Sequence, residues 1–143
     1  MQESNSLLWQ VFANSKEFLE LFSAVAHEDG MPAESVVKGN LDNAYHLIEK
    51  YQPKVLFLEE QPDIPASAYS HLGALCTSHK IALILLGREE RVIQFDPKRK
   101  FAGLTFKQMA EFGVKEYLCL PLTAKDIRLC LGSVLAERER QET

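Results

Sequence analysis

Two kinds of apolar pattern alternate along the chain. Short, mainly apolar runs lie at residues 7–13, 55–58 and 81–86. Between and after such runs, apolar residues recur at intervals of three and four, as on one face of a helix. A strand without polar alternation is buried on both faces, which is typical of a parallel sheet covered by helices on both sides. The pattern therefore predicts an α/β fold.

Applied to the whole chain, the same pattern gives five strand–helix units in succession. The strands are predicted at residues 7–13, 35–39, 55–59, 81–87 and 116–120. Because strand–helix–strand crossovers are right-handed, such a series is expected to wind into a flavodoxin-like (βα)5 sandwich of three layers. Its parallel five-stranded sheet has the expected order 2-1-3-4-5.

Helix boundaries are marked by capping signals. Asn14 followed by Glu17 has the spacing of a capping box, and so has Thr123 followed by Asp126. Gly113 is expected to end a helix that spans about residues 104–112.

The 143 residues suit a single domain. Its core is expected at about residues 7–135, and residues 136–143 are expected to form a charged tail or linker. The formal net charge of -4 argues against a general nucleic-acid binder. The longest apolar run, residues 81–86, is too short to span a membrane, and the first ten residues lack the features of a secretory signal. We therefore expect a cytoplasmic protein without membrane insertion.

Residue types that commonly form metal or catalytic sites are scattered. The cysteines Cys76, Cys119 and Cys130 are odd in number, widely spaced and set in apolar surroundings, so buried reduced thiols are expected. The four histidines form no HExxH, and Cys76 with His79 is a single i, i+3 pair. No glycine-rich nucleotide loop and no GxSxG sequence occur. We expect no metal, no cofactor and no enzymatic activity.

The most informative positions are those that follow the strands. In a doubly wound sheet, the functional crevice lies beyond the carboxyl ends of the strands. The third predicted strand runs directly into two carboxylates, which raises the question of a reactive acid at this edge. The residues predicted to surround the crevice are Ala13, Asn14, Glu59, Glu60, Gly87 and Leu120.

Three phrases of the sequence resemble the response-regulator receiver (CheY-like) domain. They are "ANSKEFLELF", "QPKVLFLEE" and "EFGVKEYLCLPL", and the resemblance extends over about residues 7–135. A receiver accepts a phosphoryl group on an aspartate, with an acidic pair that holds Mg²⁺, a hydroxyl residue and a lysine. The resemblance places the acidic pair at Ala13 and Asn14 and the phosphoacceptor at Glu59. It places the hydroxyl residue at Gly87 and the lysine at Leu120.

Every one of these positions departs from the receiver pattern. Ala13 cannot bind a metal, and Asn14 lacks the negative charge that attracts Mg²⁺. Glu59 has one methylene more than aspartate, which moves its carboxylate by roughly 1 to 1.5 Å, and a shift of about 1 Å can cost about 100-fold in rate. A permanent mimic of phospho-aspartate at Glu59 is disfavoured, because Gly87 and Leu120 supply neither hydroxyl nor cation. Glu59 and Glu60 are therefore expected to be solvated or part of a binding surface.

These departures imply a degenerate receiver that works through protein–protein contact without phosphorylation, in a two-component-type or pilus-assembly system. The chain is similar to the atypical receiver at the N-terminus of pilus-assembly (tight-adherence) ATPases. Receivers dimerise through the face made by the fourth helix, the fifth strand and the last helix. The candidate interaction surface on that face comprises Leu104, Met109 and Tyr117, and a second copy of the chain is one expected partner there.

Two alternatives remain open. The first is a phosphoaccepting regulator that uses displaced carboxylates such as Glu60 or Asp63, and the second is a flavodoxin-like domain that binds a small ligand. The long connection of residues 88–101 carries Val92, Ile93 and Phe95 beyond the needs of the core, and we expect these to cover the crevice or meet a partner.

Overall fold

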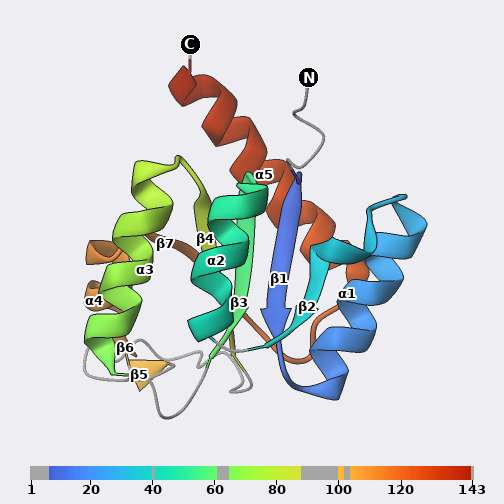
Figure 1. The fold of residues 1–143 in the computed structure, drawn as a ribbon, viewed down its shortest axis with the longest axis horizontal. Coiled ribbons are helices and arrows are strands. Elements are labelled where there is room, and N and C mark those ends of the chain that lie inside the picture. Colours follow the sequence, from blue (N-terminus) through green and yellow to red (C-terminus); the bar gives the residue numbers. More distant parts are fainter. Residues whose placement is uncertain (1–6, 40, 61–64, 88–99, 102–103, 143) are drawn as a thin grey trace.

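A five-stranded parallel sheet forms the centre of the molecule (Figure 1). The computed structural model describes residues 7–39, 41–60, 65–87, 100–101 and 104–142, with their side chains except at 41–43, 66, 100–101, 104–106 and 141–142. The sheet has the order β2-β1-β3-β4-β7, and every neighbouring pair is parallel. Since β7 is the fifth strand of this sheet along the chain, the predicted fold class and strand order are confirmed.

Helices alternate with the strands as predicted. The strands are β1 (Trp9–Ala13), β2 (Val36–Lys38), β3 (Val55–Glu59), β4 (Ala82–Gly87), β5 (Lys100–Phe101), β6 (Leu104–Thr105) and β7 (Val114–Cys119). The helices are α1 (Lys16–Glu28), the short 3-10 turn η2 (Ala33–Ser35), α2 (Leu41–Tyr51), α3 (Ala66–Ser78), α4 (Phe106–Glu111) and α5 (Ala124–Glu142).

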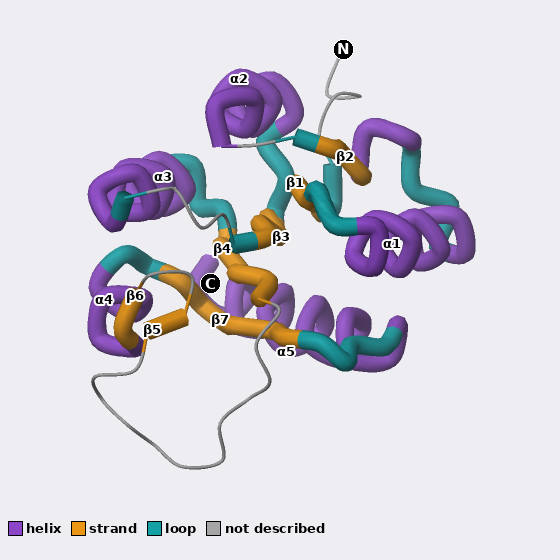
Figure 2. The backbone as a smooth tube through the Cα atoms, turned by 90° about the horizontal axis from the view of Figure 1, so that it is seen from below, coloured by secondary structure: helices purple, strands orange, loops and turns teal. Residues whose placement is uncertain are grey.

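The sheet separates two hydrophobic clusters. Seen along the strands, α1 and α5 cover one face, and α2, α3 and α4 cover the other (Figure 2). On the α1–α5 side, Trp9 packs edge-on against Phe22 and Phe57, with ring centroids 5.8 and 6.1 Å apart. On the opposite side, Phe12 joins a cluster with residues of α2, α3 and α4. Burial on both faces explains why the central strands β3 and β4 are apolar almost throughout.

Several predicted helix ends are confirmed. Thr123 and Asp126 form the predicted capping box: the Thr123 amide donates to Asp126 Oδ2 at 3.0 Å, and the Asp126 amide donates to Thr123 Oγ1 at 3.2 Å. Gly113 follows α4 with a φ of 82°, a left-handed conformation that glycine adopts without steric penalty. The apolar stripe of α5 packs inward, with Ile127 fully buried.

Other boundaries differ from the prediction. The helix expected over residues 104–112 begins at Phe106, because Leu104–Thr105 forms β6 and pairs antiparallel with β5. Residues 136–142, which belong to the predicted charged tail or linker, are helical and continue α5, in keeping with the high helix propensity of the Glu, Arg and Gln residues there. Most of the long connection, with Val92, Ile93 and Phe95, lies outside the described residues. Within the described part of the chain, no helix is long and apolar enough to cross a membrane.

Candidate functional site at the carboxyl ends of the strands

The carboxyl ends of β1, β3 and β4 meet at one edge of the sheet, which Figure 2 shows from that side. The structure brings Asn14, Glu59, Glu60, Gly87 and Tyr117 together there through hydrogen bonds and close packing. Two of the predicted site residues belong instead to the hydrophobic core. Ala13 is fully buried in the α1–α5 cluster, and Leu120 packs against the same cluster.

Glu59 connects the end of β3 to the start of α1. Its Oε1 atom accepts hydrogen bonds from the backbone amides of Asn14, at 2.7 Å, and Ser15, at 2.9 Å. Helix N-termini carry amides without an intrahelical partner and a partial positive charge, so a carboxylate there is favourable. Glu59 therefore performs the role that a capping side chain usually has, although it comes from a distant strand.

This arrangement corrects the predicted start of α1. The N-cap residue is Ser15 rather than Asn14, and its own side chain makes no capping hydrogen bond. Asn14 instead donates from Nδ2 to the backbone oxygen of Gly39, at 3.1 Å, beyond the end of β2. The predicted capping box of Asn14 with Glu17 is wrong because Glu59 already occupies the amides that precede the helix.

The expectation that Glu59 is solvated is also wrong. Its relative exposure is 5%, which makes it one of the few buried charged or polar side chains among the described residues. A buried carboxylate needs hydrogen-bond donors, and the amides of Asn14 and Ser15 provide two. Hydrogen bonds to a charged group contribute about 1.5–3 kcal/mol each, so this contact is a firm link between β3 and the β1–α1 loop.

Tyr117 occupies the space beside Gly87. The ring lies so close to the Gly87 backbone that a Cβ atom at this position would overlap the tyrosine hydroxyl and Cζ. Tyr117 Oη donates a hydrogen bond to Glu60 Oε2 at 3.2 Å, and the Glu60 amide donates to the backbone oxygen of Leu86 at 2.7 Å. Glycine is thus required where a receiver has its hydroxyl residue, because any larger residue would displace the Tyr117 ring.

The candidate interaction surface is corrected in two of its three members. Tyr117 and Met109 have relative exposures of 8% and 4% and belong to the cluster under α2, α3 and α4. Both side chains therefore point into the molecule. The side chain of Leu104 lies outside the described residues.

The residues at this edge do not fit the Mg²⁺ site that receivers use. Ala13 offers no ligand, the Asn14 amide group contacts Gly39, and one Glu59 oxygen is held by two backbone amides. Throughout the described residues, no three His, Cys, Asp or Glu side chains gather in a group that could hold a metal. Hard divalent cations require several oxygen ligands with negative charge, and the residues described at this edge present too few.

Comparison with known proteins identifies the fold. No protein-family model and no curated protein matches the sequence. Among solved structures, the chain is similar to the signal receiver domain of a protein described as a Luxo repressor from Vibrio parahaemolyticus. That alignment has a TM-score of 0.68 and 11% identity, over 96% of this chain and 95% of the other.

Two further solved structures agree. A CheY-like response regulator receiver domain from Methanospirillum hungatei gives a TM-score of 0.69 with 13% identity, over 95% of this chain and 99% of the other. A response regulator receiver domain from Clostridium thermocellum gives 0.65 with 13% identity, over 92% and 96%. At such identities the comparisons show that the chain has the receiver fold, while its chemistry has to be inferred from its own residues.

Proposed function

We propose that this chain is a receiver-type signalling domain that acts through protein–protein contact and without phosphorylation. The observation that carries the proposal is the hydrogen bonding of Glu59. Its carboxylate lies at the position of the phosphoacceptor, yet it is buried and accepts the amides of Asn14 and Ser15. A phosphoryl group on this carboxylate would have to break that contact, and among the described residues at this edge there is no lysine to stabilise the transferred charge.

The packing of Tyr117 supports the same proposal. Phosphoryl transfer would need open space beside Gly87, and the Tyr117 ring fills it. The Leu120 side chain, which stands at the lysine position, packs against the core and brings no positive charge to this edge. The described residues at this edge thus offer neither room for a phosphoryl group beside Gly87 nor a cation or hydroxyl that would contact it.

A phosphoaccepting regulator is the alternative function. It would use Glu60, whose Oε2 accepts the Tyr117 hydroxyl, or Asp63, which lies outside the described residues. Glu60 is half-buried and lies next to Glu59, so it is the carboxylate at this edge that a phosphodonor could reach more easily. The absence of a lysine among the residues placed at this edge weighs against it.

The biological setting is a finer part of the proposal. We infer a cytoplasmic role with a protein partner or a second copy, in a two-component-type or pilus-assembly system. Its support is the resemblance of the sequence to the atypical receivers of pilus-assembly ATPases. A neighbouring pilus operon, or an ATPase domain in the same reading frame, would support that setting. Phosphotransfer to this chain from a histidine kinase encoded next to it would contradict the proposal.

Phosphorylation can be tested directly. The protein is incubated with radiolabelled acetyl phosphate and Mg²⁺, next to a receiver that has the complete acidic set as positive control. We expect no label on this chain and no Mg²⁺-dependent change in the fluorescence of Trp9, the single tryptophan, which lies buried on β1. Label at Glu59 or Glu60, located by mass spectrometry, would overturn the proposal in favour of the phosphoaccepting alternative.

A further inference from the structure

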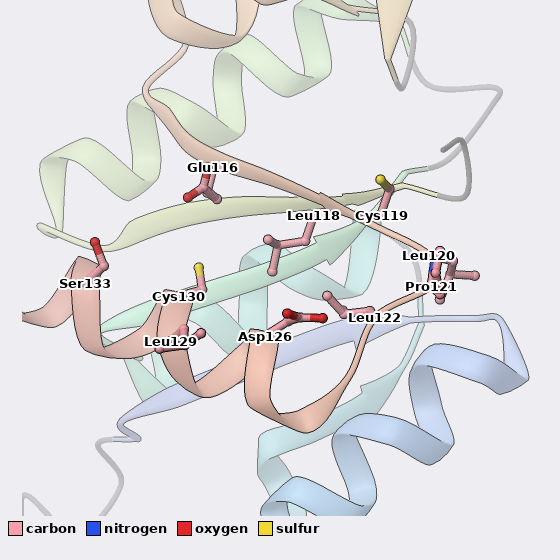
Figure 3. Close-up of a pocket in the computed structure, with 10 residues that line it drawn as sticks. All are labelled: Glu116, Leu118, Cys119, Leu120, Pro121, Leu122, Asp126, Leu129, Cys130 and Ser133. Atoms are coloured by element: carbon pink, nitrogen blue, oxygen red, sulfur yellow. The ribbon is translucent and has the colours of Figure 1, made fainter. Parts of the chain in front are cut away.

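A groove runs along the outer edge of the sheet, between β7 and α5 (Figure 3). Its volume is about 640 Å³. Glu116, Leu118 and Leu120 line it from β7 and its end, and Leu129 and Cys130 line it from α5. The groove is separate from the carboxyl-end site, because Leu118 points to the α1–α5 face of the sheet, whereas Tyr117 points to the opposite face.

The groove has an exposed apolar rim. Leu129 has a relative exposure of 62%, and among the described residues Leu8, at 42%, is the other large apolar side chain exposed to this degree. A single exposed leucine is ordinary on a protein surface. Leu129, however, borders a hollow that also presents Leu118, Leu120, Leu122 and Pro121, so it extends a continuous apolar surface.

The strand that forms one wall is an edge strand. In the described part of the chain, β7 pairs with β4 and has no strand on its other side. An edge strand presents backbone amides and carbonyls that can pair with an added strand. Side chains of such a strand alternate between the two faces, so every second one would lie over the groove.

Two carboxylates flank the apolar part. Glu116, from β7, stands at one end. Asp126 stands at the start of α5, held by the Thr123 amide through Oδ2. Among the side chains that the structure describes, no Lys or Arg lines the groove. Its charge is therefore complementary to a basic partner.

We propose that this groove binds an extended protein segment that has apolar side chains at alternate positions and Lys or Arg residues at its ends. The segment would pair with β7, place its apolar side chains against Leu118 and Leu129, and place its cations near Glu116 and Asp126. This inference rests on the proposed function, since it names the chemistry of the partner through which the domain would act.

The test uses a fluorescent nine-residue peptide with leucine at alternate positions, threonine between them and two basic residues at each end. Binding is measured by fluorescence anisotropy at low and high salt. We expect the peptide to bind, and to bind more weakly as salt screens the flanking charges. A peptide with serine in place of leucine, and one with acidic ends, are expected to bind at least about tenfold more weakly, which is about 1.4 kcal/mol.

Variants of the protein locate the site. Leu129→Asp is expected to weaken binding at least about tenfold, while Leu8→Asp, a matched change at the other exposed leucine, leaves it unchanged. Glu116→Lys should weaken binding of the basic peptide and strengthen that of the acidic-ended peptide. Glu137→Lys, the same reversal elsewhere on α5 and outside this groove, is the control. Because these side chains are exposed, we expect the substitutions to leave the fold intact. Unchanged thermal unfolding of each variant would verify this.

Three results would overturn the inference. They are equal binding of the basic and acidic peptides, binding insensitive to Leu129→Asp, and a dimer in sedimentation that Leu129→Asp dissociates, which would make a second copy the occupant. None of them depends on phosphorylation. Failure of the proposed function would instead appear as label on a carboxylate, so the two failures are distinguishable.

Discussion

At the scale of single residues, the length of one side chain decides what the carboxyl end of β3 can do. The extra methylene of Glu59 allows its carboxylate to reach the amides of Asn14 and Ser15 across the edge of the sheet. The sequence identified this position but predicted an acid that is solvated or part of a binding surface. The contact joins residues 44 and 45 positions apart, so no local pattern could have indicated it.

The first prediction concerns that contact. Glu59→Ala leaves two amides without their acceptor and is expected to lower the free energy of unfolding by about 2–4 kcal/mol. Glu59→Asp, which installs the residue type of a phosphoacceptor, should also destabilise, by about 1–3 kcal/mol, because the shorter side chain loses this reach. Urea unfolding followed by Trp9 fluorescence measures both. Glu49→Ala, on the exposed side of α2, is the control and should change stability by less than about 0.5 kcal/mol. A Glu59→Asp variant as stable as the parent would contradict the capping role.

The second prediction concerns the contact of Gly87 with Tyr117. Gly87→Ala is expected to cost about 1–3 kcal/mol, because the new methyl group overlaps the tyrosine ring. In a Tyr117→Ala background the same change should cost little, which a double-mutant cycle would report as a coupling free energy. Gly132→Ala, in α5 where a Cβ meets nothing within 4 Å, serves as control and should stabilise slightly. Additive effects of Gly87→Ala and Tyr117→Ala would show that the ring does not fill this space.

At the scale of elements, the ends of helices show where sequence prediction succeeds. The start of α5 was predicted correctly because Thr123 and Asp126 supply both hydrogen bonds from within four consecutive residues. The start of α1 was predicted incorrectly because its acceptor comes from β3. The hairpin of β5 and β6 was missed because strands of two residues carry no periodicity.

The third prediction tests the capping box of α5. Thr123→Ala removes the acceptor of the Asp126 amide and is expected to lower stability by about 1 kcal/mol, whereas Thr123→Ser keeps the hydroxyl and should cost less. Both are measured by urea unfolding. Equal stability of the alanine and serine variants would show that the hydroxyl does not cap the helix.

At the scale of the whole molecule, the fold could be predicted from the continuity of apolar strands. Leu56 and Leu58 point into one hydrophobic cluster and Phe57 points into the other, so all three are fully buried. Neither face of such a strand requires polar residues. The functional surface could not be predicted in the same way. Met109 and Tyr117 were assigned to an interaction surface, but the sequence does not reveal which face of a short helix or an edge strand is covered.

The fourth prediction follows from burial of the thiols across the molecule. Cys76, Cys119 and Cys130 are free and buried, as predicted. Burial raises the pKa of Cys76 from 9.0 to about 12, and burial together with Glu116 raises the pKa of Cys130 to about 11. Below about pH 9 both folded and unfolded chains keep these protons; above it the unfolded chain ionises first. Stability should therefore fall as the pH rises from about 9 toward the folded pKa values.

Unfolding titrations at pH 8, 9 and 10 measure this effect. For Cys76 the expected loss at pH 10 is about 1 kcal/mol relative to pH 8. Cys76→Ala should lower stability at every pH but flatten its decrease between pH 8 and 10. A variant with the same decrease as the parent would show that Cys76 is not the source.

The packing of Tyr117 on Gly87 also constrains which sequences can be reached from this one by single substitutions. Threonine or serine at position 87 would overlap the Tyr117 ring, and aspartate at position 59 would leave the amides of Asn14 and Ser15 without their acceptor. Each change is therefore unfavourable when it occurs alone. A path toward a phosphoacceptor would cross several less stable intermediates. Neutral substitutions are therefore expected to preserve the contacts of Glu59 and of Tyr117 with Gly87. Close relatives should share the glycine and the tyrosine as a pair.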